Sequence, residues 1–442
     1  MARQEGRGEH NTLVYYLGSK QRMASAVEDA IDEVAAGDEP VADLFAGVGS
    51  ASCAIARQHD VVAVDTQEYA RVICSALLEE AHAPALELPS VMGAYNACSV
   101  ELQEAYEPLL SYEEDALSGV GNGRYGALSG IVEHGCMLVE YRADVPHDLA
   151  LAMRRCEEKR RMNGIEDDLD AIVRYFGGTY FSYEQAIGIA SARASAMQAG
   201  DAWRNTLLAA TLSAASHCVS AVGGQFAQPI KTVDASGRLK ESAIRQAASC
   251  RRTQPKEVFL DAIGAICRTS RPRRGNLAVR SEGISYLRSQ GDDAYVAIYA
   301  DPPYSRYHYS RYYHVLETIV LGDQPVVTTN PATGRPSRGI YRAGRYQSPF
   351  STLGGAPKAF EELFAECSRC SPSLVLSYSP YPEGGRSTPR MVTIDTLIAF
   401  ARSRYSHVEL RYVEGVTHSK LNAANAELEV SPHAEVMIIC RR

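Results

Sequence analysis

The feature that most constrains the fold lies in residues 40–65, where a glycine-containing turn and a short helical pattern separate two apolar runs. The first run continues through Asp43 and Phe45 to Gly47 and Gly49, and glycines there let a ligand approach the backbone. The second run ends in Asp65, and an acid at a strand end suits the hydroxyls of a ribose. This order of elements predicts an α/β fold with a nucleotide-like ligand at the sheet edge.

A second motif, Asp301-Pro302-Pro303-Tyr304, follows the apolar run 295–300. Asp301 can accept a hydrogen bond from an exocyclic amine, and a proline carbonyl can do the same. Tyr304 offers an aromatic face for stacking. These groups suffice to hold a flipped-out nucleobase by its amino group, whereas a stiff Asp-Pro loop without chemistry is the alternative for this motif taken alone.

Together, the two motifs resemble the Dam-like family of N6-adenine DNA methyltransferases, with the cofactor motif first and the base-binding motif later. Residues 15–20 also resemble the opening segment of that family. The resemblance covers residues 14–75 and 276–320 and implies S-adenosyl-L-methionine as cofactor. The implied cofactor-binding residues are Tyr16, Lys20, Asp43, Phe45, Gly47, Gly49, Asp65 and Glu282. Glu282 departs from the family pattern, which has an aspartate near this position, and a surface glutamate is the alternative.

The resemblance implies a Rossmann-like, S-adenosylmethionine-dependent methyltransferase sheet with a large, mainly helical insertion for target recognition. We expect residues 11–80 and 276–442 to form the catalytic domain and residues 81–275 to form the insertion. Apolar runs at 374–378 and 435–440 predict further strands of the sheet, and amphipathic patterns at 360–369 and 393–402 predict helices beside it.

The charge distribution suggests where DNA binds. The net charge of the chain is −8, but residues 231–290 contain thirteen basic residues against five acidic ones. Because phosphate contacts are local, this stretch predicts a DNA-facing surface, and a solvated face is the alternative. A second basic stretch, 335–345, follows the second motif. The expected DNA contacts are Lys231, Arg251, Arg252, Arg273 and Arg274, together with Tyr307 and Tyr309 as stacking residues.

Composition indicates a cytoplasmic protein without a membrane span. Eleven scattered cysteines, an odd number, favour a reducing compartment. The longest uncharged run, 205–230, contains many polar residues and predicts a buried helix and loop. Cys367 and Cys370 form a lone CxxC sequence, for which a helix end is favoured over a zinc site, and no metal is expected.

The expected activity is transfer of a methyl group to the N6 amine of a flipped adenine in a specific DNA sequence. Such an enzyme would serve restriction–modification or self-marking in phage defence. Double-stranded DNA is the expected partner, and a subunit of a restriction or defence system is a second candidate. Three alternatives stay open: an N4-cytosine methyltransferase, an RNA adenine methyltransferase, and a non-catalytic DNA-recognition subunit of a defence complex.

Overall fold

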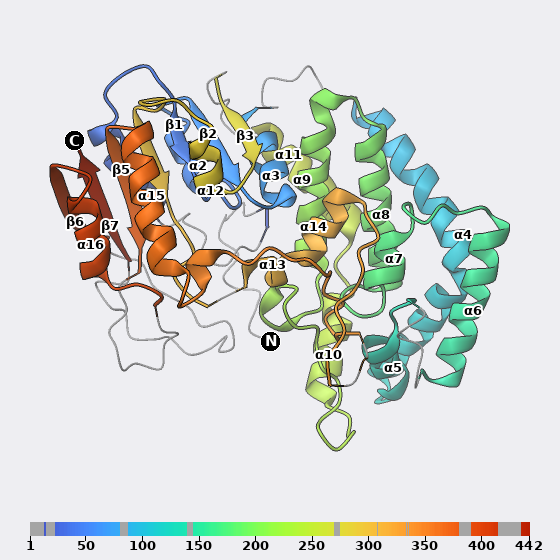
Figure 1. Ribbon diagram of the computed structural model, residues 1–442. Coiled ribbons are helices and arrows are strands. Elements are labelled where there is room, and N and C mark those ends of the chain that lie inside the picture. Colours follow the sequence, from blue (N-terminus) through green and yellow to red (C-terminus); the bar gives the residue numbers. More distant parts are fainter. Residues whose placement is uncertain are drawn as a thin grey trace. The chain divides into compact units, whose positions relative to one another are not determined.

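The computed structural model describes residues 13–14, 23–79, 87–138, 145–268, 275–306, 308–332, 334, 336–379, 390–413 and 435–442 (Figure 1). The chain divides into two compact units. The sheet unit consists of Tyr16–Ala83, Ser270–Glu317 and Gly344–Arg442, and the helical unit consists of Met1–Tyr15, Pro84–Thr269 and Thr318–Ala343. Residues 318–343 therefore group with the helical unit, although the sequence had placed them in the catalytic domain.

The sheet unit contains seven described strands in the order β3-β2-β1-β4-β5-β7-β6. Their bounds are β1 Val41–Asp43, β2 Val61–Asp65, β3 Leu277–Arg280, β4 Ala297–Ala300, β5 Ser373–Tyr378, β6 His407–Val413 and β7 Glu435–Arg441. All neighbouring strands among β1 to β5 pair in parallel, and β7 is antiparallel to both of its neighbours, β5 and β6. The chain leaves β1 towards β2 and β3 and returns to β4 on the other side of β1, so the strand order reverses between β1 and β4.

Helices cover both faces of this sheet. Successive residues of a strand point to opposite faces, and they belong to different cores here: Ala42 and Ile298 pack in one core, and Val41 and Ala297 in the other. The described helices of the unit are α1 Ala24–Val34, α2 Ser50–Ile55, α3 Glu68–Leu78, α12 Gly283–Arg288, α13 Tyr309–Tyr312, η5 Pro349–Ser351, α15 Ala356–Cys370 and α16 Ile394–Arg402, and α14 His314–Leu321 begins there. A sheet buried on both faces explains why its central strands are almost wholly apolar.

Helix α15 illustrates how a sequence pattern becomes packing. Its apolar side chains recur every three or four residues, and Phe360, Leu363, Phe364 and Cys367 are fully buried against the sheet. Burial of each large side chain contributes about 1.5–3 kcal/mol. Figure 1 shows α15 beside β5. Cys370 is the last residue of α15, so the prediction of a helix end for the CxxC sequence is confirmed.

The predicted succession of strand, glycine turn, helix and strand over residues 40–65 is confirmed by β1, α2 and β2, and helices α1 and α3 flank it. The predicted strands at 295–300, 374–378 and 435–440 correspond to β4, β5 and β7, while β3 and β6 were not predicted. The mixed α/β architecture with its seven-stranded sheet is consistent with a methyltransferase fold.

The helical unit is built around α8, a helix with buried residues on every side. Its described helices are α4 Leu88–Gly121, α5 Gly126–His134, α6 His147–Met162, α7 Ala171–Phe176, α8 Tyr183–Gln198, α9 Asp201–Cys218, η4 Val222–Gly224, α10 Glu241–Cys250 and α11 Pro255–Arg268. Ser182 and Gln185 form a reciprocal capping box at the start of α8. In the described parts of the chain, no helix combines the length and apolar character needed to cross a membrane.

Candidate active site

A cavity lies at the carboxyl ends of β1, β2 and β4 in the sheet unit. The space between its lining residues amounts to about 900 Å³ when the open solvent at its mouth is included. The strand ends contribute Leu44, Phe45, Asp65 and Asp301, and the start of α12 contributes Glu282. Further lining comes from residues 308–310 and from four residues between 346 and 351. The cavity therefore brings the two sequence motifs together.

The glycine turn lies directly behind this lining. Gly47 and Gly49 have φ angles of +54° and +78°, which only glycine adopts readily. A Cβ atom on Gly49 would lie 3.2 Å from the Cys74 sulfur, so this position also leaves little space for a side chain. The Gly47 N–H donates to Asp65 Oδ2 at 3.0 Å. This bond ties the turn after β1 to the end of β2.

Asp65 lines the cavity from the end of β2. Its Oδ1 accepts the N–H of Gln67 at 2.9 Å, while its Oδ2 accepts that of Gly47. Burial raises the pKa of Asp65, and these backbone hydrogen bonds oppose the shift. These two hydrogen bonds hold the Asp65 side chain in a fixed orientation at the cavity.

Asp43, the last residue of β1, is buried next to the cavity and supports the turn that follows the strand. It is fully buried, and it accepts a hydrogen bond from Ser52 Oγ at 2.6 Å and a longer one from the N–H of Phe45 at 3.4 Å. Burial raises the pKa of Asp43 to about 7, and the charges of Asp301 and Asp65 add to this effect. Asp43, Gly47 and Gly49 do not line the cavity themselves; they shape the turn from which Leu44 and Phe45 reach it.

Asp301 to Tyr304 follow β4 and line the cavity, as the sequence predicted. The Tyr304 ring packs edge-on against Tyr378, with centroids 5.6 Å apart and an interplanar angle of 68°. The guanidinium carbon of Arg390 lies 4.7 Å from the Tyr304 ring centroid, and the Tyr304 hydroxyl donates to Glu435 at 3.4 Å. Contacts from several segments therefore fix this aromatic ring.

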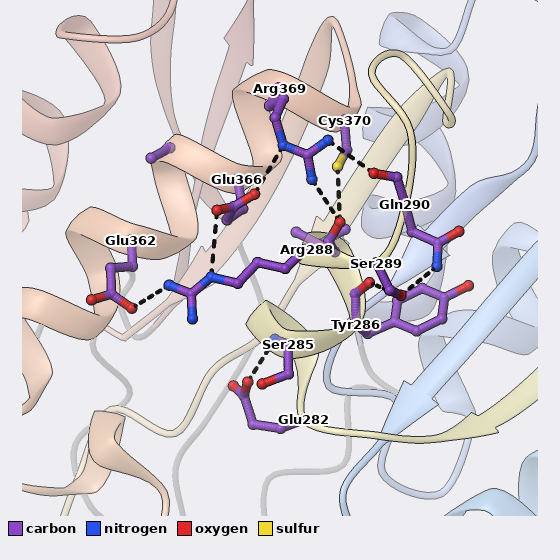
Figure 2. A network of polar contacts seen from close by, with 12 residues as sticks. Glu282, Ser285, Tyr286, Arg288, Ser289, Gln290, Glu362, Glu366, Arg369 and Cys370 are labelled. Atoms are coloured by element: carbon purple, nitrogen blue, oxygen red, sulfur yellow. Dashed lines mark hydrogen bonds and ion pairs between the residues drawn. The ribbon is translucent and has the colours of Figure 1, made fainter.

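Glu282 is positioned by the helix that it caps. Its Oε2 accepts the N–H of Ser285 at 2.8 Å at the start of α12, and the residue lines the cavity. Figure 2 shows how α12 is fastened to α15, since Arg288 pairs with Glu362 at 2.9 Å and with Glu366 at 3.5 Å. Glu282 is thus held at the cavity by a helix whose ion pairs fix it to α15. The residues around Glu282 in the sequence do not predict these ion pairs.

Sequence reasoning missed the wall formed by Tyr346, Gln347, Ser348 and Ser351. Ser310 Oγ donates to the Tyr346 carbonyl at 2.7 Å and hydrogen-bonds His308 Nδ1 at 2.8 Å, which joins this wall to the segment after Tyr304. Burial raises the pKa of Tyr346 to about 12, and the nearby carboxylates of Glu282 and Asp65 add to the shift. Contacts between residues distant in the sequence bring this loop to the cavity, so no local sequence pattern predicts its place there.

The structure corrects one expected DNA contact. Arg251 is only 4% exposed, and its guanidinium donates to Glu113 Oε1 and Ser220 Oγ, both at 3.1 Å, and to the carbonyl of Gly178. A buried cation whose donors are used inside the protein cannot contact DNA phosphate. Lys231 and Arg252 are exposed, as a phosphate contact requires.

Other expected site residues have different outcomes. Tyr309 lines the cavity. Tyr16, Lys20, Arg273, Arg274 and Tyr307 lie outside the described residues. In the second basic stretch, Arg338 pairs with Glu133 at 3.0 Å and Arg342 pairs with Asp323 at 2.6 Å. No cluster of three or more His, Cys, Asp or Glu among the described residues could hold a metal ion.

Part of the chain matches a known protein family. Residues 16–106 match the model of the D12 class N6 adenine-specific DNA methyltransferase family. The matched span contains the glycine turn and Asp65 but ends before Asp301. No curated protein matches the chain significantly. The family match confirms the resemblance to the Dam-like family and indicates that the protein is an adenine-specific DNA methyltransferase.

Proposed function

We propose that this methyltransferase transfers the methyl group of S-adenosylmethionine to the N6 amine of an adenine flipped out of a specific DNA sequence. One observation carries the proposal: a single cavity contains the carboxylates of Asp65 and Glu282, and also the whole Asp301 to Tyr304 motif. A donor site and an acceptor site must share one space for a methyl group to pass between them.

The lining residues fit S-adenosylmethionine. Asp65 offers a carboxylate to the ribose hydroxyls, and Glu282 offers one to the amine of the cofactor's adenine, next to the apolar side chains of Leu44 and Phe45. Among the described lining residues, three are acidic and none is lysine or arginine, which suits a ligand with a positively charged sulfonium. When bound, the cofactor supplies an electrophilic methyl group.

The strand order supports the same location. In open α/β sheets, ligands bind beyond the carboxyl ends of the strands at the point where the strand order reverses. That point lies between β1 and β4 here, and the cavity begins at the ends of these strands. A Rossmann-like cofactor site is therefore the arrangement that we propose for this sheet.

Asp301 and Tyr304 supply the acceptor side of the reaction. The adenine amine is a weak nucleophile because its lone pair is delocalised into the ring. Hydrogen bonds from its two protons to Asp301 and to a proline carbonyl favour a tetrahedral nitrogen, on which the lone pair is localised. Tyr304 stacks on the flipped base and restricts its orientation. Asp301 need not be a strong base, since the methylated amine loses its proton readily.

The family implies a DNA substrate, and two described residues favour phosphate contacts by the helical unit. Lys231 and Arg252 are exposed, and cations on a surface release counterions from DNA on binding. We propose that the helical unit recognises the target sequence and that methylation marks the host's own DNA, within a restriction–modification or phage-defence system. A subunit of such a system would be a further partner.

Tritiated S-adenosylmethionine tests this function when it is offered with genomic DNA, RNA or protein as methyl acceptor. Digestion to nucleosides then identifies the labelled base. We expect label in N6-methyladenine from DNA. Label in N4-methylcytosine, RNA or protein instead would contradict the proposal, as would binding of the cofactor without any transfer to DNA.

A further inference from the structure

Helix α3 follows the cofactor-facing turn and begins without a cap of its own. The first N–H groups of a helix have no partner within that helix. Gln67, the residue before α3, makes no side-chain capping bond. Glu317 takes this role from a segment that lies 249 residues further along the chain: its Oε1 accepts the N–H of Glu68 at 3.1 Å, and its Oε2 accepts that of Tyr69 at 3.0 Å.

Glu317 is held in place by further contacts. It is 5% exposed and lies on α14, and Arg280 at the end of β3 reaches its Oε1 at 3.4 Å. Tyr313, directly before α14, packs its ring against that of Tyr69 with centroids 5.4 Å apart. The start of α3 is therefore held by a carboxylate and an aromatic contact together, and a negative charge at this end of a helix is also electrostatically favourable.

The segment held by Glu317 forms one wall of the cavity. Asp65, Thr66, Gln67 and Tyr69 all line it, and the N–H of Gln67 donates to Asp65 Oδ1. The Asp65 carbonyl accepts the N–H of Ser281 at 2.9 Å, which links the same turn to the end of β3. A shift of the first turn of α3 would therefore move the carboxylate proposed to bind the ribose.

We propose that Glu317 is a positioning residue for the methyl donor, an inference that rests on the proposed function. It is not among the lining residues of the cavity and acts through the start of α3. Because α13 and α14 follow Asp301 to Tyr304 in the chain, Glu317 also connects the cofactor-facing turn to the segment that continues the base-facing motif. The side chain thereby fixes the donor wall relative to the acceptor wall.

Glu113 provides a matched control in the helical unit. This buried glutamate on α4 accepts the N–H of Tyr183, the first residue of α8, at 2.7 Å, and it pairs with Arg251 at 3.1 Å. Its chemistry is the same as that of Glu317: a buried carboxylate, a helix start and an arginine. Glu113 does not line the cavity.

The experiment compares Glu317→Gln, Glu317→Ala and Glu113→Gln in the full chain. Thermal unfolding, calorimetric affinity for S-adenosylmethionine, and KM and kcat with saturating DNA are measured for each. Glutamine keeps one acceptor oxygen and loses the charge, so we expect the Kd and KM for the cofactor to rise about fivefold in Glu317→Gln. We expect a rise of about tenfold or more in Glu317→Ala, with a smaller change in kcat at saturating cofactor.

Glu113→Gln should lower the unfolding temperature and leave the cofactor affinity unchanged. Unaltered Kd and KM in Glu317→Gln would overturn the inference, as would an equal rise in Glu113→Gln. If Glu317→Ala does not fold, the glutamine variant decides. The wild-type protein separates the two proposals: failure to bind the cofactor contradicts the proposed function and the role of Glu317 with it, whereas normal binding with unchanged affinity in Glu317→Gln contradicts the role of Glu317 alone.

Discussion

The sheet unit and the helical unit use the charged residues singled out by sequence in opposite ways. In the sheet unit, Asp65 is the last residue of β2, Asp301 directly follows β4, and both line a cavity. In the helical unit, Arg251 and Arg338 belong to basic stretches, yet they donate to carboxylates within the protein. A strand end fixes the position of its side chain through backbone geometry, whereas a run of charges does not say which way each one points.

The largest expected effect is the loss of stability on removing the buried ion pair between Arg251 and Glu113. Arg251→Ala would leave Glu113 buried without its arginine, and such a loss costs about 3–5 kcal/mol of the free energy of unfolding. Urea denaturation measures the loss. The adjacent Arg252→Ala is the control and should change stability by less than about 0.5 kcal/mol, because this side chain is exposed. Equal stabilities of the two variants would show that Arg251 is not needed inside the helical unit, and the contrast with the acidic residues of the sheet unit would not hold.

Asp301→Ala tests the cavity side of the comparison. We expect turnover to fall by on the order of 3 kcal/mol in transition-state stabilisation, about a hundredfold or more, because Asp301 should contact the reacting amine. Calorimetry should show little change in affinity for S-adenosylmethionine. Asp395→Ala, an exposed acid at the start of α16, is the control and should retain wild-type turnover. Near-wild-type turnover of Asp301→Ala would refute its role.

Much of the sheet unit could be predicted from local sequence. The strand, glycine turn and helix around Gly47, and the motif after β4, are specified within a few residues. Tyr346 and Glu317 could not be found in this way, since tertiary hydrogen bonds bring them to their places. The exposed edges of the sheet were missed as well: β3 has only four residues and half-exposed positions, and β6 has few buried ones, so neither shows a clear apolar run.

The buried carboxyl of Asp43 should make the stability of the protein depend on pH. Burial raises the pKa of Asp43 from 3.8 to about 7. Between about pH 4 and pH 7, the carboxyl is therefore protonated in the folded state and ionised in the unfolded state. The resulting stabilisation is complete below about pH 4 and is lost as the pH rises through 7. We expect on the order of 1 kcal/mol less stability at pH 8 than at pH 6 from this group. In urea denaturation, Asp43→Asn should lack that difference; an unchanged pH dependence would place the raised pKa elsewhere.

The smallest effect concerns the exposed cations of the helical unit. Replacing Lys231 and Arg252 by alanine should weaken duplex binding and flatten its dependence on salt by about one unit of slope for each residue. Cofactor affinity should not change. Lys358→Ala, an exposed lysine on α15, is the control for charge alone. If the double variant has the wild-type salt dependence, Lys231 and Arg252 form a solvated face, and Arg273 and Arg274 become the next pair to test.

We expect the protein to methylate adenine in DNA at the cavity of the sheet unit, with Asp301 in contact with the reacting amine. A map of modified bases tests this in DNA from a host without adenine methylation that expresses either the wild-type protein or Asp301→Ala. Sequencing of the native DNA locates N6-methyladenine at single-base resolution. We expect methylated adenine within one recurring sequence for the wild type and none for the variant. Unmodified adenine in both, or the same methylation pattern in both, would contradict the role of the cavity and of Asp301.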